Sequence, residues 1–178
     1  MLFRSGGGGA ILLLGKTEAG GLGASLYLQE LHGVIAGKPA PADLEQEKKL
    51  HRLMRSVLKQ SGIRAAHDVG EGGILWALAE MTLGSDSAGA EADLPIGSGE
   101  RPEEALFGEG GGRILLEVDE GTVAEVERLA REAGVGCRAV GKTGGKTLRV
   151  KCGVEDVRWE VCDLKKLFEE SLPLALGS

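Results

Sequence analysis

The chain has 178 residues, of which 42% are hydrophobic, 27% are charged and 3% are aromatic. This length suits one globular domain that buries about two thirds of its unfolded surface. The formal net charge is −6. Because phosphate binding depends on Lys and Arg, this acidic balance argues against a nucleic acid or an anionic membrane as partner. We also find no apolar run near the roughly 18 residues of a membrane-spanning helix.

The start of the chain differs from the rest, because Met1–Ser5 is followed by four glycines. We interpret residues 1–10 as a leader or linker and residues 11–178 as one domain. This domain begins almost inside a strand, so we expect it to be a fragment of a larger enzyme.

The cysteines give no sign of a disulfide framework or a zinc site, because they are odd in number and lack CxxC spacing. They are Cys137, Cys152 and Cys162. Without a signal peptide, this pattern predicts a reducing, cytoplasmic location.

The first elements are a strand and two helices. Ile11–Leu14 is a short apolar run, which predicts a buried strand. A short helix or turn is expected at Ser25–Leu31. Asp43 with Gln46 forms a capping-box pattern that opens an amphipathic helix over Leu44–Gln60. Its apolar stripe consists of Leu50, Leu53, Met54, Val57 and Leu58, and Gly62 closes it.

The middle of the chain continues the alternation. We expect a strand at Ile63–Ala66, a loop at His67–Gly73 and a helix at Ile74–Leu83. Because this helix is mostly apolar, Trp76 should be buried on most sides. Ala90–Leu94 has the pattern of a strand.

After it come a helical turn at Glu103–Phe107, a glycine loop at Gly108–Gly112 and a strand at Arg113–Val118. The Ile, Leu and Val content of that strand suggests a central position in a sheet. Thr122 with Glu125 forms a second capping box, which opens another amphipathic helix.

The C-terminal part predicts a β-hairpin, because Cys137–Val140 and Thr147–Val150 flank two glycines. Val157–Val161 indicates a weaker strand, and Asp163 should cap a last helix that runs to Leu172. The chain therefore belongs to the α/β class, as a single domain with a mixed sheet and helices packed on it in layers.

Two patterns are misleading. Residues 136–143 match the phosphate-binding G-x-x-x-x-G-K-[ST] pattern, but that loop needs a helix directly after it, and here a strand pattern follows. The histidines, His32, His51 and His67, are far apart, and no nucleophile motif accompanies them. We therefore predict neither a P-loop nor a nucleophilic hydrolase.

The first candidate loop is residues 65–73, which leaves a strand and enters a helix. Its glycines would let backbone N–H groups approach an anion at the helix N-terminus. Asp68 and Glu71 would instead suit a Mg²⁺ ion bound to phosphate. The alternative is structural: Asp68 or Glu71 caps the helix, and the glycines make a tight turn.

The second candidate loop is residues 106–113, in which a carboxylate and a guanidinium surround four glycines. Glu109 and Arg113 could clamp a polar ligand or pair with each other. The candidate site residues are His67, Asp68, Gly70, Gly72 and Gly73 in the first loop and Phe107, Glu109, Gly110, Gly111 and Arg113 in the second.

Four segments together resemble the end of the large subunit of phosphoribosylformylglycinamidine synthases. Residues 21–28 are similar to ELGGSEYL, residues 43–51 to that family's DLxxEkxLh helix start, residues 66–73 to AHDVSDGG, and residues 107–113 to FSES-x-GR. An Ala-Leu-Ala-Glu-Met run at 77–81 follows the third segment as expected, and this pair is the specific part of the resemblance. The resemblance covers Ile11 to Leu174.

This resemblance implies the three-layer α/β/α fold of the aminoimidazole ribonucleotide synthetase C-terminal domain. It also implies an ATP-dependent and Mg²⁺-dependent enzyme that turns formylglycinamide ribonucleotide into its amidine with glutamine-derived ammonia. An upstream ATP-binding domain and a glutaminase would be partners, and a homodimer is a further expectation. The segment would belong to the second, degenerate copy of the fold, so that Asp68 becomes only a pseudo-equivalent of a metal ligand.

The departures from the family pattern fit such a degenerate copy. Gly70, Gly108 and Gly110 replace serines, and Gly21 and Leu26 replace glutamates, which removes hydrogen-bonding groups. We therefore expect the fragment alone to be inactive, with His67 and Asp68 as a structural corner and no tightly bound nucleotide. The alternatives are aminoimidazole ribonucleotide synthetase, selenophosphate synthetase, thiamine-phosphate kinase or a non-catalytic nucleotide-binding or assembly module.

Overall fold

The computed structural model describes residues 2–3, 8–84 and 88–175, the last four by backbone only. The strands are β1 (Ala10–Gly15), β2 (Ile63–Asp68), β3 (Ala90–Leu94), β4 (Arg113–Val118), β5 (Cys137–Thr143), β6 (Thr147–Cys152) and β7 (Glu155–Glu160). The α-helices are α1 (Leu26–His32), α2 (Leu44–Val57), α3 (Gly73–Thr82), α4 (Pro102–Phe107), α5 (Val123–Ala133) and α6 (Val161–Ala175). Every strand and helix predicted from the sequence is present. The strands β3 and β4 have the predicted bounds, and the other elements have shifted ends.

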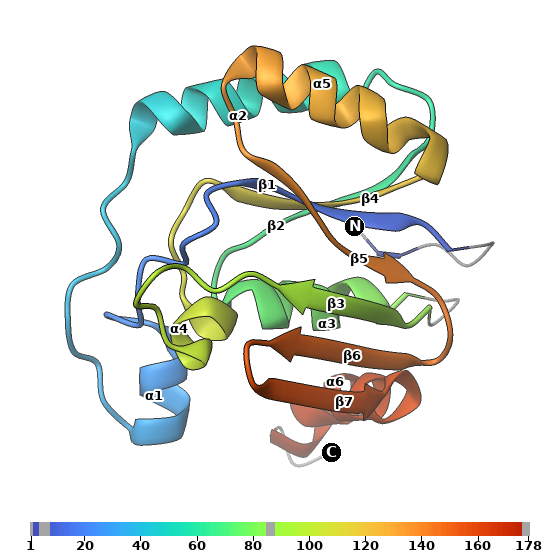
Figure 1. Ribbon diagram of the computed structural model, residues 1–178. Helices are drawn as coiled ribbons and strands as arrows, with labels where there is room; N and C mark the ends of the chain where they lie inside the picture. The colour runs from blue at the N-terminus through green and yellow to red at the C-terminus, as the bar shows by residue number, and fades with distance from the viewer. Residues whose placement is uncertain (1, 4–7, 85–87, 176–178) are drawn as a thin grey trace.

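The strands form one mixed sheet in the order β2-β4-β1-β5-β3-β6-β7 (Figure 1). Only the β3–β6 pair is parallel among these neighbours. The predicted hairpin of β5 with β6 is therefore wrong, because β3 lies between them. The turn after β5 bonds to Gly89 instead: the Gly144 N–H donates to the Gly89 carbonyl at 2.8 Å, and the Gly89 N–H donates to Gly145 at 3.0 Å.

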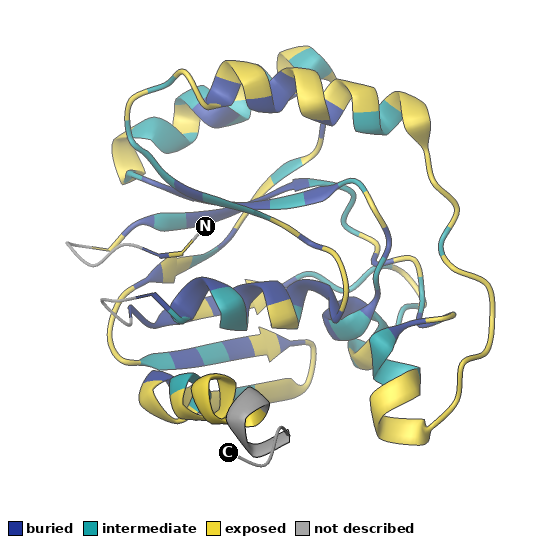
Figure 2. Ribbon diagram, turned by 180° about the vertical axis from the view of Figure 1, so that it is seen from behind, coloured by how far each residue is buried: buried dark blue, intermediate teal, exposed yellow. Residues whose placement is uncertain are grey.

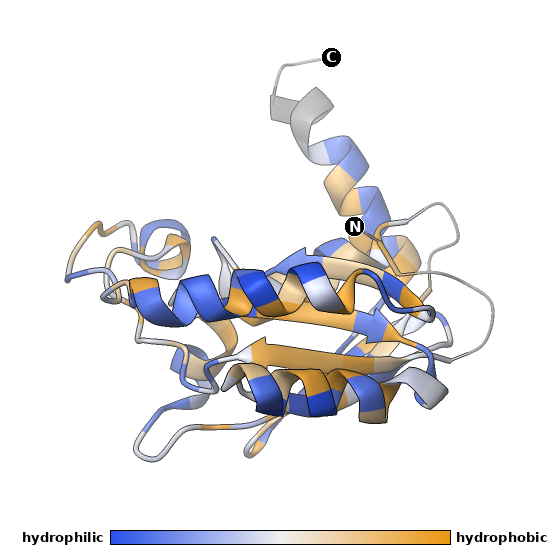
Figure 3. Cartoon of the chain, turned by 90° about the horizontal axis from the view of Figure 1, so that it is seen from above, coloured by the Kyte–Doolittle hydropathy of each residue, from blue (hydrophilic) through white to orange (hydrophobic). Residues whose placement is uncertain are grey.

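The central strand β1 divides the core between the two faces of the sheet. Leu12 and Leu14 pack against α2 and α5, whereas Ile11 and Leu13 contribute to the core around α3 and α4. Neighbouring side chains of a strand point to opposite faces, so a fully apolar strand indicates helices on both sides. Figure 3 shows the polar outer surfaces of α2 and α5 above the apolar strands. The α/β class and the layered arrangement are confirmed.

Helix ends account for several corrections. Asp43 caps α2 as predicted, accepting from the Gln46 N–H at 3.1 Å. However, α2 ends at Val57, and Leu58 is 57% exposed instead of lying in the apolar stripe. Thr122 makes no cap bond to α5, because its hydroxyl donates to the Ser61 carbonyl at 3.0 Å.

Two further expectations near the ends of α3 and α6 are wrong. Trp76 is 50% exposed, because it lies on the outer side of α3 while Ala77 and Leu78 face the core. Helix α6 begins at Val161, so Asp163 lies inside its first turn and does not precede it.

The described part of the N-terminal segment lies against the domain. Phe3 is 3% exposed within the core around α3, and the Gly9 N–H donates to the Thr143 hydroxyl at 2.9 Å. That hydroxyl donates in turn to Glu117, a fully buried carboxylate on β4. The segment read as a leader therefore contributes contacts to the fold, and β1 includes Ala10. The division of the chain at residue 10 stays a prediction.

Candidate functional site

The two candidate loops meet at one end of the sheet. The register pairs Gly15 at the end of β1 with Arg113 at the start of β4, and it pairs Asp68 at the end of β2 with Ile114. The segments that follow β1 and β2 and precede β4 therefore emerge together. We call these segments, residues 16–25, 69–73 and 108–112, the loop cluster.

Glu109 joins three parts of the loop cluster through one oxygen. Its Oε1 accepts from the Leu26 N–H, at the first residue of α1, at 2.8 Å. The same oxygen accepts from the Gly72 N–H, at the N-cap of α3, also at 2.8 Å. Helix N-termini have unpaired N–H groups and a positive partial charge, which a carboxylate satisfies well.

Arg113 donates hydrogen bonds to backbone carbonyl groups of the second loop. Its Nη2 donates to the Gly108 carbonyl at 2.5 Å and its Nε to the Gly110 carbonyl at 3.1 Å. The side chain is buried, and this desolvation lowers the pKa of Arg113 to about 10, while Glu100 opposes the shift. The guanidinium is still charged at neutral pH. Glu109 and Arg113 therefore bind backbone groups, whereas the sequence suggested that they bind a ligand or each other.

Close contact with Ala19 explains two glycines of the second loop, Gly108 and Gly110. The Gly110 N–H donates to the Ala19 carbonyl at 2.8 Å. A Cβ atom at position 110 would lie 2.5 Å from that carbonyl oxygen, and one at position 108 would lie 2.6 Å from the Ala19 Cβ. A serine at either position would clash. Packing therefore requires glycine at these two positions. This reason differs from the loss of hydrogen-bonding groups that the sequence suggested.

The first loop turns through two glycines with positive φ angles. Gly72 and Gly73 have φ values of 73° and 72°, and a Cβ at position 73 would lie 2.6 Å from the Leu106 carbonyl oxygen. Only glycine adopts this conformation freely, and only glycine fits here. The turn sets the N-terminus of α3 against the end of α4.

His67 and Asp68 lie on β2, so the strand extends beyond the predicted start of the loop. The Asp68 side chain is 90% exposed, and α3 has no side-chain cap at Gly72. The alternative that Asp68 or Glu71 caps this helix is therefore wrong, and replacing Asp68 removes no helix cap.

The imidazole of His67 lies largely inside the structure, with oxygen atoms next to both ring nitrogens. Nδ1 lies 2.7 Å from the Asp68 carbonyl oxygen, and Nε2 lies 3.4 Å from Glu80 on α3. These contacts fix the ring against α3. Asp68 and Glu71 are both exposed carboxylates at this corner, and they are available to a cation.

Among the described residues no group of three or more His, Cys, Asp or Glu side chains is arranged to hold a metal ion. The exposed carboxylates of Asp68 and Glu71 would supply too few of the six ligands that Mg²⁺ requires, so any ion here would need phosphate oxygens or another domain. In the same part of the chain no helix is long and apolar enough to cross a membrane. The three cysteines are free thiols.

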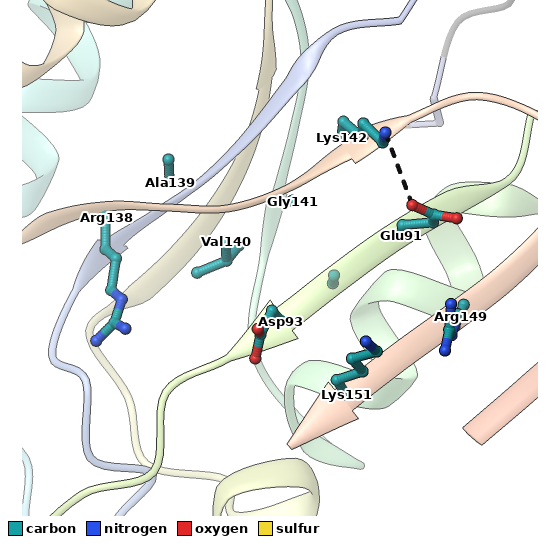
Figure 4. Close-up of a pocket in the computed structure, with 10 residues that line it drawn as sticks. Glu91, Asp93, Arg138, Ala139, Val140, Gly141, Lys142, Arg149 and Lys151 are labelled. Atoms are coloured by element: carbon teal, nitrogen blue, oxygen red, sulfur yellow. Dashed lines mark ion pairs between the residues drawn. The ribbon is translucent and has the colours of Figure 1, made fainter. Parts of the chain in front are cut away.

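A groove of about 500 Å³ lies away from the loop cluster, over β5, β3 and β6 (Figure 4). Several of its charges are already paired. Lys142 and Glu91 approach each other to 3.8 Å within the groove, and Arg149 binds Asp156, which lies outside it. None of the predicted site residues lines it. We interpret it as the solvated face of the sheet that α2 and α5 leave uncovered.

Sequence reasoning identified the two loops but missed the residues that connect them. Glu100 accepts from the Ala19 N–H at 2.8 Å and from the Gly97 N–H at 2.9 Å, which ties the cluster to the segment before α4. No motif marks Ala19 or Glu100. Their role depends on a hydrogen bond between residues that are 81 positions apart in the sequence.

We predict that Gly110→Ser lowers the free energy of unfolding by about 1–3 kcal/mol, because the new side chain overlaps a backbone carbonyl that cannot move alone. Gly111→Ser is the matched control, since a Cβ there meets only the end of the flexible Glu47 side chain at 3.0 Å. Urea unfolding of both variants measures the difference. Equal stabilities for the two variants would contradict the close approach of residue 110 to Ala19.

The comparisons with known proteins agree with this architecture. The protein named "Phosphoribosylformylglycinamidine synthase subunit PurL" from Parasynechococcus marenigrum is 37% identical over 96% of this chain and 23% of its own length. The protein of the same name from Rhodospirillum rubrum is 41% identical over 93% of the chain and 22% of its own length. The chain thus spans about a fifth of these curated relatives.

A solved structure of Thermotoga maritima PurL complexed with ATP superposes with a TM-score of 0.72 at 19% identity, over 92% of this chain and 27% of the other. At this identity the likeness shows the fold. The family model described as "AIR synthase related protein, C-terminal domain" matches residues 6–153. The chain therefore belongs to the family of AIR synthase related C-terminal domains.

Proposed function

We propose that this chain works as the C-terminal domain of a phosphoribosylformylglycinamidine synthase large subunit. The observation that carries the proposal is the shared name of relatives that are 36–41% identical and cover up to 96% of the chain. The convergence of the three family-like segments in one loop cluster supports it. Residues 21–28, 66–73 and 107–113 are distant in sequence but are joined here by Glu109.

The whole enzyme would convert formylglycinamide ribonucleotide, ATP and ammonia from glutamine into the amidine, ADP and phosphate. An amide carbon is a poor electrophile, so ammonia cannot displace its oxygen directly. Transfer of the γ-phosphoryl group to the amide oxygen breaks the terminal P–O–P bond and releases ADP. Ammonia then adds to the carbon, the phosphate group leaves with the oxygen, and the nitrogen loses its extra protons to water.

In this reaction the present domain would supply the wall of the site and no catalytic side chain. Asp68 would contribute one oxygen to a Mg²⁺ ion whose other ligands are phosphate oxygens and groups of an adjoining domain. The backbone of residues 70–73 and 108–112 would face the ligand. This assignment rests on the exposure of Asp68 and on the internal bonds that already occupy Glu109 and Arg113.

The proposed partners follow from the proposed role as a domain of the synthase. An upstream ATP-binding domain would complete the nucleotide site, and a glutaminase would provide ammonia. The free cysteines are consistent with a cytoplasmic location. A homodimer through the half-exposed Trp76 and its apolar neighbours remains part of this proposal.

We predict that the isolated chain binds ATP no more tightly than about 1 mM, which corresponds to roughly −4 kcal/mol. The physical reason is that Glu109 already accepts the Gly72 N–H at the N-terminus of α3, and residues 137–143 form β5 instead of a phosphate loop. Isothermal titration calorimetry with Mg²⁺ present measures the affinity. Micromolar binding would show that the domain carries a nucleotide site of its own.

The function itself is tested by replacing the matching C-terminal segment of the Parasynechococcus relative with this chain. We expect the chimaera to form the amidine from formylglycinamide ribonucleotide, and the relative without this segment to form none. The released phosphate and the amidine product are measured together.

Circular dichroism and gel filtration test whether the chimaera is folded. If it is not, a second chimaera is made by the same exchange in the Rhodospirillum rubrum relative. Folded chimaeras of both relatives without amidine formation would contradict the proposed function and favour a different member of the superfamily or an assembly module.

A further inference from the structure

Helix α1 has little of its own to hold it in place. It contains seven residues, none of them buried, and Figure 2 shows it at the periphery of the molecule. Helices this short are not stable in water without tertiary contacts. The Ser25 cap and the Gly33 C-cap satisfy its own ends but do not attach it to the rest of the domain. Its position must therefore depend on a small number of bonds.

Those bonds come from the second loop. Glu109 accepts from the first N–H of α1, and Phe107 packs against the Tyr27 ring with centroids 4.8 Å apart. The same Glu109 oxygen accepts from the Gly72 N–H of α3. Hydrogen bonds to a carboxylate are among the stronger ones in proteins.

We propose that Glu109 is a positioning residue that docks α1 onto the N-terminus of α3. It acts through the two helices, because its Oε1 accepts from a backbone N–H group of each. Resting on the proposed function, this inference gives Glu109 the task of holding residues 20–25 and 70–73 at a fixed spacing in the assembled enzyme. The sequence had suggested that Glu109 and Arg113 clamp a polar ligand or pair with each other.

The test follows the amide protons of Leu26 and Gly72 by NMR hydrogen exchange in the 178-residue chain. Glu109→Ala should speed exchange at both amides by about tenfold or more, since one lost charge-assisted bond is worth at least that factor. Glu109→Gln should give rates between those of the native chain and Glu109→Ala, because its amide oxygen still accepts both bonds but carries no charge. Glu103→Ala is the matched control, a neighbouring exposed carboxylate on α4 for which we expect native rates.

If Glu109→Ala does not fold, the Glu109→Asp variant is used in its place. Aspartate keeps the charge, but its side chain is one methylene shorter and its oxygens lie farther from the two N–H groups. The proposal is overturned if exchange at Leu26 and Gly72 is unchanged in a folded Ala or Asp variant, or if Gln behaves like Ala. A uniform increase that includes the β1 amides would also overturn it, since it would show a general loss of stability. None of these results depends on turnover, so this test can fail while the proposed function holds.

Discussion

The loop cluster exists because its backbone polar groups are satisfied from inside the chain. Two glycine-rich loops and the start of α1 leave N–H and C=O groups without partners in a helix or a sheet, and such groups are costly when buried. Arg113 donates to the carbonyls of Gly108 and Gly110, and Glu109 accepts from the amides of two helices. One side chain of each charge, both within the same short segment, thus holds three distant parts of the chain together.

The rest of the fold presents this segment in a fixed place. Strand β4 lies between β2 and β1, so Arg113 at its start is anchored by the most buried part of the sheet. Helices cover both faces of β1, and the glycine-rich loops lie at the end of the sheet. A companion domain of the kind proposed would therefore meet a surface that is already ordered by internal bonds.

Local sequence patterns predicted the elements well, because strand and helix periodicity is a property of neighbouring residues. The Asp43 cap, the buried run at Ile11–Leu14 and the glycine loops are of this kind. The errors arose where distant residues decide. A two-glycine turn after β5 looked like a hairpin, but β3 takes the position beside it. Thr122 looked like a cap, but its hydroxyl binds Ser61. The partners of Glu109 and Arg113 were equally invisible, since backbone groups carry no sequence signal.

Arg113 supports the loops and is not held in reserve for a ligand. This role is tested by the free energy of unfolding of Arg113→Met, a replacement of similar length without donors. Because two buried carbonyls would lose their partner, we expect the free energy of unfolding to fall by about 2 kcal/mol or more. An unchanged or increased stability would mean that the buried guanidinium is a cost to the folded chain, as a residue kept for binding would be.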